Sequence, residues 1–140
     1  MLFNNRNGGS KPEPINEIPE FESLLLRFSG MRLTEEYEIV SKGNTSEISY
    51  YQIRYSGEED LRDLQKRAVC VTRDVTDILN ECKAGQWNGF HGKHPMGVLD
   101  GRMFTLTAYV NGGPSLFADG SENFPKYFNA FEKWLREKLF

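Results

Sequence analysis

Residues 103–140 read MFTLTAYVNGGPSLFADGSENFPKYFNAFEKWLREKLF and carry the strongest structural signals of the chain. Met103–Val110 alternates apolar and polar side chains, which is typical of a β-strand with one buried face. Asn111-Gly112-Gly113 then favours a type I′ hairpin turn, because both central residues of that turn take positive φ. We expect a return strand over residues 115–118 and a second polar turn over residues 119–123.

A long helix is predicted from Pro125 to the end of the chain. Proline suits the first helical position, where its missing N–H costs nothing, and Ser121, Glu122 and Asn123 just before it are expected to cap the helix. The apolar side chains then recur at helical spacing and form one stripe, which consists of Phe124, Phe128, Phe131, Leu135 and Leu139. This stripe predicts a helix packed on a sheet.

Upstream, residues 23–29, 37–42 and 48–55 also alternate with period two and are predicted to be strands. Lys42-Gly43-Asn44-Thr45 favours a hairpin between the second and third of them. Residues 58–66 are highly charged, and we expect a connection there with one or two helical turns.

A short strand or extended segment is expected over residues 67–72. Residues 73–83 have the spacing of an amphipathic helix, with Thr72 or Asp74 as its cap and Gly85 as its left-handed end.

The order of these elements predicts an α+β fold. We expect a mainly antiparallel sheet of about five to six strands with two helices packed on it, the longer one C-terminal. Residues 1–20 are rich in Asn, Gly and Pro and are expected to form a flexible leader, whereas residues 21–140 form a single domain. Cys70 and Cys82 are not in a CxxC pair and are expected to be buried, reduced thiols.

Charge and hydropathy exclude two classes of partner. The net charge is −3 and the pI is about 5.5, with Lys and Arg scattered among the acidic residues, so binding to nucleic acid is not expected. No apolar run approaches the length of a membrane span, so insertion in a membrane is not expected either. No signal-peptide core follows Met1, and we therefore expect a cytoplasmic location.

Two histidines, His91 and His94, lie three residues apart in a predicted loop over residues 86–101. Together with Asp100 or Asp119 they have the side chains for a zinc-like site, or for a general base with its orienting carboxylate. The alternative is two solvent-exposed loop histidines, since the chain has no third histidine and no cysteine pair nearby. Asp100 and Asp119 each precede a glycine and are also typical of turns. We predict no cofactor and no metal.

An aromatic surface is a second candidate site. Trp87 and Phe90 in the same loop, with the strand tyrosines Tyr50, Tyr51 and Tyr55, have rings that suit a binding surface. Alternating tyrosines in a strand are also typical of core packing and cross-strand pairs.

Four motifs resemble those of an uncharacterised family of small proteins and lipoprotein domains from gut-dwelling anaerobic Gram-positive bacteria. They are WNGF at residues 87–90, VLDG at 98–101, VNGG at 110–113 and GSENFP at 120–125. The resemblance covers about residues 24–140 and implies the fold, but no activity, cofactor or partner. The chain lacks the lipobox cysteine of the lipoprotein members, which counts against a membrane-anchored role.

The functional prediction is a small non-enzymatic binding domain for a protein or small molecule, with Trp87, Phe90, His91, His94 and Asp100 as binding residues. One alternative is a metal-assisted or acid–base enzyme that uses His91, His94 and Asp100 as catalytic residues. Another is a small inhibitor or regulatory protein. The oligomeric state stays open.

Overall fold

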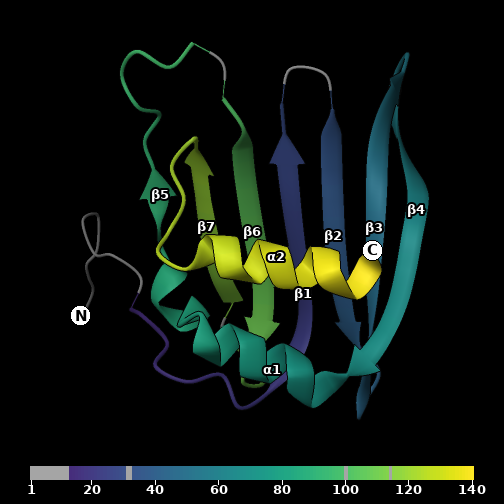
Figure 1. Ribbon diagram of the computed structural model, residues 1–140, viewed down its shortest axis with the longest axis vertical. Helices are drawn as coiled ribbons and strands as arrows, with labels where there is room; N and C mark the ends of the chain where they lie inside the picture. The colour runs from purple at the N-terminus through teal and green to yellow at the C-terminus, as the bar shows by residue number, and fades with distance from the viewer. Residues whose placement is uncertain (1–12, 31–32, 100, 114) are drawn as a thin grey trace, which may run out of the picture.

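The computed structural model describes residues 13–30, 33–99, 101–113 and 115–140. The chain forms one sheet of seven strands with two α-helices (Figure 1). In chain order the elements are β1 (Phe21–Ser29), β2 (Thr34–Ser41), β3 (Thr45–Ser56), β4 (Glu59–Val71), α1 (Thr72–Glu81), the 3-10 helix η2 (Ala84–Trp87), β5 (His91–Gly92), β6 (Met103–Val110), β7 (Ser115–Ser121) and α2 (Phe128–Leu139).

The strands lie in the order β4-β3-β2-β1-β6-β7-β5. All neighbours are antiparallel except β5, which pairs parallel to β7 through His91–Asp119 and Gly92–Gly120. The predicted α+β class, the mostly antiparallel sheet and the longer C-terminal helix are confirmed. The expected strand number is too low, because β4 and β5 were not recognised as full members of one seven-stranded sheet.

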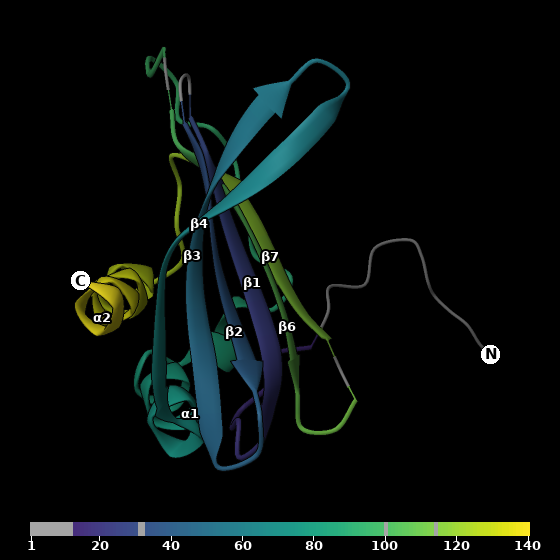
Figure 2. The same cartoon turned by 90° about the vertical axis from the view of Figure 1, so that its right-hand side faces the viewer.

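Both helices cross the strands on the same face of the sheet (Figures 1 and 2). In the described part of the chain the opposite face carries no helix, and we call it the open face. The alternation of apolar and polar residues along each strand explains why only one face is covered, because successive side chains of a strand point to opposite faces. In β6, for example, Phe104, Leu106, Ala108 and Val110 are buried under the helices.

The core between the sheet and α2 is largely aromatic. The predicted stripe is confirmed, since Phe128, Phe131, Leu135 and Leu139 are all buried. The Phe128 ring lies 4.8 Å from the ring of Phe104 in β6 and 6.1 Å from that of Phe28 in β1, measured between centroids. α2 is therefore held across the two central strands.

Helix ends differ from the predictions. α2 begins at Phe128 and not at Pro125, because Tyr127 takes a left-handed φ of 68°. Ser121, Glu122 and Asn123 therefore lie too far upstream to cap it. Thr72 does not cap α1 through its side chain; its hydroxyl bonds that of Ser46 instead.

Gly85 is needed for a close contact and not for a left-handed end of α1. Lys83 takes that conformation, with φ of 54°. A Cβ on Gly85 would lie 1.7 Å from the carbonyl oxygen of Ile15. The N–H of Ile15 also donates to the Gly85 carbonyl at 2.9 Å. The N-terminal segment thus packs directly against η2.

Residues 13–20 of the expected flexible leader are packed on the domain. Ile18 is 1% exposed, and the Asn80 side chain accepts from its N–H and donates to its carbonyl. The folded unit therefore includes residues upstream of 21. Residues 1–12, which carry the rest of that prediction, lie outside the described residues.

Residues 58–66 do not form helical turns. Residues 59–66 belong to the long edge strand β4 (Glu59–Val71), which pairs with β3 along its whole length. The first pair is Ser56 with Glu59 and the last is Thr45 with Val71. The register shifts by a bulge between the pairs that Tyr50 and Tyr51 form with β4. The outer part of the β3–β4 hairpin leans toward the open-face side of the sheet (Figure 2). The bulge fits this bend, because an extra residue in one strand increases the local twist.

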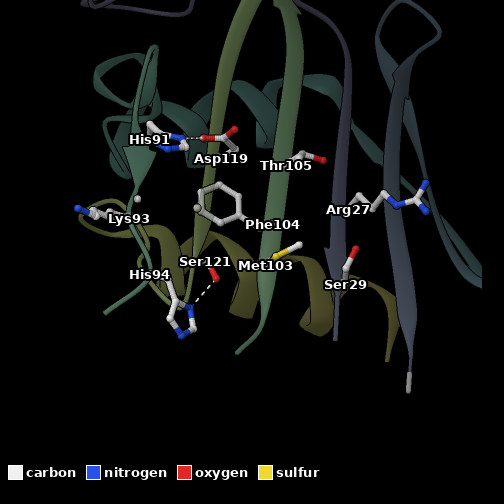
Figure 3. A pocket seen from close by; sticks show the side chains of 12 residues that line it. Arg27, Ser29, His91, Lys93, His94, Met103, Phe104, Thr105, Asp119 and Ser121 are labelled. Carbon is white, nitrogen blue, oxygen red and sulfur yellow. Dashed lines mark hydrogen bonds and ion pairs between the residues drawn. The ribbon is translucent and has the colours of Figure 1, made fainter. Parts of the chain in front are cut away.

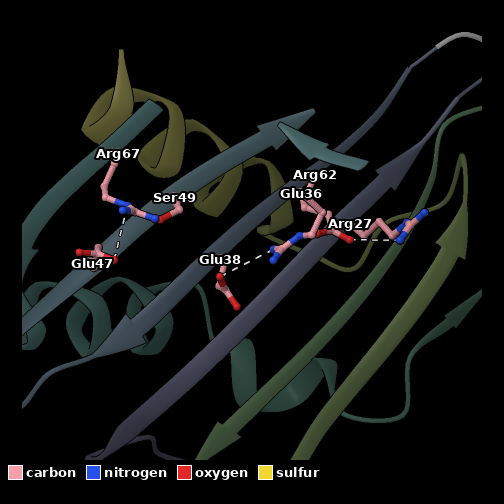
Figure 4. Close-up of polar contacts among 7 residues, drawn as sticks. All are labelled: Arg27, Glu36, Glu38, Glu47, Ser49, Arg62 and Arg67. Atoms are coloured by element: carbon pink, nitrogen blue, oxygen red, sulfur yellow. Dashed lines mark hydrogen bonds and ion pairs between the residues drawn. The ribbon is translucent and has the colours of Figure 1, made fainter. Parts of the chain in front are cut away.

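A ladder of ion pairs crosses the open face and links this hairpin to the central strands (Figure 4). Glu36 in β2, with a side chain 6% exposed, accepts from Arg27 in β1 at 3.1 Å and from Arg62 in β4 at 2.8 Å. Arg62 also lies 3.7 Å from Glu38, and Arg67 lies 3.4 Å from Glu47. The charged side chains of the open face therefore largely compensate one another.

Both cysteines are free, as predicted. Cys82 is buried, whereas Cys70 is half-buried, and burial raises the pKa of each thiol. No helix of the described residues is long and apolar enough to cross a membrane.

Candidate functional site

A pocket of about 360 Å³ lies on the open face where β5, β7, β6 and β1 adjoin (Figure 3). We call it the open-face pocket. Both predicted histidines line it, and so do the open-face side chains of three strands. Its principal lining residues are His91, His94, Met103, Phe104, Thr105, Asp119 and Ser121.

β7 places Asp119 and Ser121 at the pocket. Leu116, Ala118 and Gly120 of this strand are buried, so Phe117, Asp119 and Ser121 point to the open face. We expected Asp119 and Gly120 to form a turn; instead β7 continues to Ser121, and Glu122 is the residue with positive φ (48°).

The glycine at position 120 allows a close backbone approach. A Cβ there would lie 2.2 Å from the carbonyl oxygen of Asn123 and 2.8 Å from the Phe104 ring. Its partner Gly92 in β5 is crowded by the same carbonyl, at 2.3 Å. The Asn123 amide also donates to the Lys93 carbonyl at 3.1 Å. The segment after β7 therefore holds β5, and with it both histidines, against the sheet edge.

His91 forms a dyad with Asp119. Its Nδ1 lies 2.5 Å from Asp119 Oδ1, so Nδ1–H donates to the carboxylate and the imidazole is oriented. In the neutral ring Nε2 then keeps its lone pair. The two side chains are 78% and 31% exposed, so the dyad lies at the mouth of the pocket rather than in its depth.

His94 is held at both ring nitrogens. Its Nε2 lies 2.6 Å from the carbonyl oxygen of Val98, which can only accept, so Nε2–H donates there. Nδ1 lies 2.7 Å from the Ser121 hydroxyl, which donates to it when the ring is neutral. A Cβ on Gly101 would lie 2.9 Å from His94 Cε1, so that glycine also makes room for the ring.

The two histidines line one pocket but bind different partners and do not converge on one carboxylate. Among the described residues no group of three or more His, Cys, Asp or Glu side chains is placed to hold a metal ion. Asp100, which we expected in this site, lies outside the described residues.

The predicted aromatic surface is not assembled. Trp87 is 2% exposed, its indole N–H donates to the Lys126 carbonyl at 2.9 Å, and its ring packs against Phe128 and Phe131. Phe90 packs on the core beside Phe104. Both rings thus stabilise the core beneath the loop.

The tyrosines of β3 divide between core and surface. Tyr50 is buried, and its hydroxyl donates to Glu35; burial, followed by this hydrogen bond, raises the Tyr50 pKa to about 12. Tyr51 lies under the Arg62 guanidinium, and Tyr55 is exposed. They lie on the β4 side of the sheet, away from the open-face pocket.

The pocket lining also includes Met103, Thr105 and Ser121, which were not predicted from the sequence to lie at a site. Their signal is the alternation of β6 and β7, which places them on the face opposite Phe104 and Leu106. That alternation does not reveal which of the two faces carries helices.

Comparisons with known proteins give no relative for this chain. No protein-family model matches it, no curated protein matches it, and no solved structure matches it.

Proposed function

We propose that the protein is a small non-enzymatic binding domain that holds a small molecule in the open-face pocket. The observation that carries this proposal is the convergence of His91, Asp119 and Thr105, from three strands, around one concave site that the half-exposed side chain of Met103 also lines. Pockets that bind small molecules combine an apolar lining with a few placed polar groups and have volumes of roughly 300–1,000 Å³. The 360 Å³ of this pocket suits a small ligand.

The division between the two faces of the sheet supports the proposal. The core is complete on the helix side, so the open-face side chains around the pocket are not needed to bury apolar surface. Met103 is nevertheless half exposed, at 51%, beside the buried ring of Phe104. Apolar side chains left accessible next to fixed hydrogen-bonding groups are typical of a ligand site.

The test is a fragment screen observed by ¹⁵N–¹H NMR on the full chain. Ligands of the open-face pocket should shift the amides of β5, β6 and β7 and leave those of α1 and α2 in place. Thr105→Phe should fill the pocket and abolish the shifts. Thr107→Phe places the same ring on the same strand and face, two residues outside the pocket lining, and should leave them unchanged. Fragments that shift only helix amides, or that bind Thr105→Phe normally, would contradict the proposal.

The His91–Asp119 dyad favours a second candidate function, acid–base catalysis. A carboxylate that orients Nδ1–H leaves Nε2 of the neutral ring able to take a proton from a substrate or a water molecule. This version of the predicted enzyme uses Asp119 in place of Asp100. A screen of ester and amide substrates tests it: turnover that is lost in His91→Gln would favour the enzyme over the binding domain.

A further inference from the structure

The hydrogen-bonding groups around the open-face pocket are mainly acceptors. Asp119 uses Oδ1 for His91, and its Oδ2 has no protein partner among the described residues. Neutral His91 presents the Nε2 lone pair. The Ser121 hydroxyl gives its proton to neutral His94 and so presents only lone pairs.

The cations near the pocket point elsewhere. The Arg27 guanidinium extends across the sheet away from the pocket and donates to Glu36, and Lys93 points outward from β5 (Figure 3). The donors of Arg27 are thus directed to a buried carboxylate of the ion-pair ladder. The groups that line the pocket therefore comprise the Asp119 carboxylate, lone pairs, and the hydroxyls of Thr105 and Ser29, which can both donate and accept.

On this basis, and resting on the proposed function, we infer that the ligand of the open-face pocket is a primary ammonium compound with a short apolar body. An ammonium group has three donors and no acceptor, so it matches Asp119 Oδ2 and the neighbouring hydroxyl oxygens. Hydrogen bonds between charged groups are shorter and stronger than neutral ones. The apolar body would lie on the half-exposed side chain of Met103, which lines the pocket.

Other ligand classes fit this set less well. A carboxylate or phosphate would face the Asp119 carboxylate and the lone pairs of Ser121 and His91, without an inward cation to compensate. A neutral alcohol can donate one hydrogen bond, but it gains no charge interaction with Asp119. The lining thus discriminates between ligands by their charge, in addition to the limit that the pocket volume sets on their size.

Three probes that share one ring and differ in charge test the inference. They are benzylammonium, benzyl alcohol and benzoate. Each is titrated into the full chain, and binding is followed by ¹⁵N–¹H NMR. We expect benzylammonium to shift the amides of Thr105 and Asp119, with a Kd at least about tenfold below that of benzyl alcohol. A hydrogen bond to a charged group is roughly twice as strong as a neutral one, and the expected tenfold difference in Kd corresponds to about 1.4 kcal/mol. Benzoate should bind most weakly.

Asp119→Asn should remove the preference for benzylammonium, so that its Kd is no longer below that of benzyl alcohol. Asp77→Asn makes the same change of charge at an exposed position of α1 and is the matched control. It should leave all three affinities unchanged. Thermal unfolding of each variant verifies that it is folded.

Two results overturn the inference. If benzyl alcohol or benzoate binds as tightly as benzylammonium, and Thr105→Phe abolishes that binding, the ammonium class is wrong while the pocket function stands. If none of the probes shifts the pocket amides, the ammonium class is again wrong, and the fragment screen decides the pocket function independently. A preference for benzylammonium that survives Asp119→Asn contradicts the assignment of the carboxylate.

Discussion

Truncation of Phe131 tests how α2 is held on the sheet. The side chain is fully buried, and its ring lies 6.0 Å from that of Trp87 and 6.2 Å from that of Trp134. Replacing a buried Phe by Ala removes transfer free energy and leaves a cavity, which together cost about 3–5 kcal/mol. That is a large part of the roughly 5–15 kcal/mol by which such domains are stable.

The assay is urea unfolding followed by fluorescence. With an m-value of about 2 kcal/mol/M, a loss of about 4 kcal/mol lowers the midpoint of Phe131→Ala by about 2 M. Lys133→Ala, two residues away on the exposed side of α2, should stay within about 0.5 kcal/mol of the wild type. An unchanged midpoint in Phe131→Ala would refute the packing of α2 on the core.

Three further predictions concern other parts of the domain. Glu36→Ala removes the carboxylate shared by two arginines and should lower the free energy of unfolding by about 1–3 kcal/mol in urea titrations. Arg54→Ala breaks an exposed ion pair and should leave the urea midpoint unchanged. Equal effects of Glu36→Ala and Arg54→Ala would contradict the expected difference between a buried and an exposed ion pair. Because the pKa of Tyr50 is raised to about 12, the unfolded chain ionises first as the pH passes 10. Stability should therefore fall between pH 10 and about 12 in urea midpoints measured against pH. This loss should be smaller in Tyr50→Phe, where the raised pKa of buried Tyr37 still contributes to it. Burial raises the pKa of the Cys82 thiol. At about pH 8.5 iodoacetamide should therefore alkylate Cys82 more slowly in the folded chain than in the urea-unfolded chain, as measured by mass spectrometry. Equal alkylation rates would show that the thiol is accessible in the folded chain.

The elements that bury an apolar face were predictable from the sequence. β1, β2, β3, β6 and α2 each have one buried set of side chains, so their periodicity shows directly in the residues. For β4, only the end at residues 67–71 was expected to be extended, and the rest was not predicted as a strand because most of its side chains are exposed. An edge strand in a projecting hairpin has little apolar surface to bury, and charged side chains such as Arg62 and Asp63 suit it, since they also hinder pairing with other chains.

The candidate site was only partly predictable. The pairing of His91 with Asp119 depends on a strand of two residues, too short to give any periodic signal. The clue available was the two glycines, Gly92 and Gly120, which permit the close approach of Asn123. Burial of Trp87 depends on the position of α2 relative to the loop, and local sequence does not contain that information.

The position of β1 has a consequence for folding during synthesis. It is the first strand in the described part of the chain but lies in the middle of the sheet, between β2 and β6. The hairpins from β1 to β4 can pair as soon as they leave the ribosome, whereas one edge of β1 stays unpaired until residues 103–110 are made. During that interval Leu24, Leu26 and Phe28 lack both their partner strand and the cover of α2. The nascent chain is therefore most prone to aggregation before residues 103–110 are made, and a chaperone that shields the β1 edge would act at that stage.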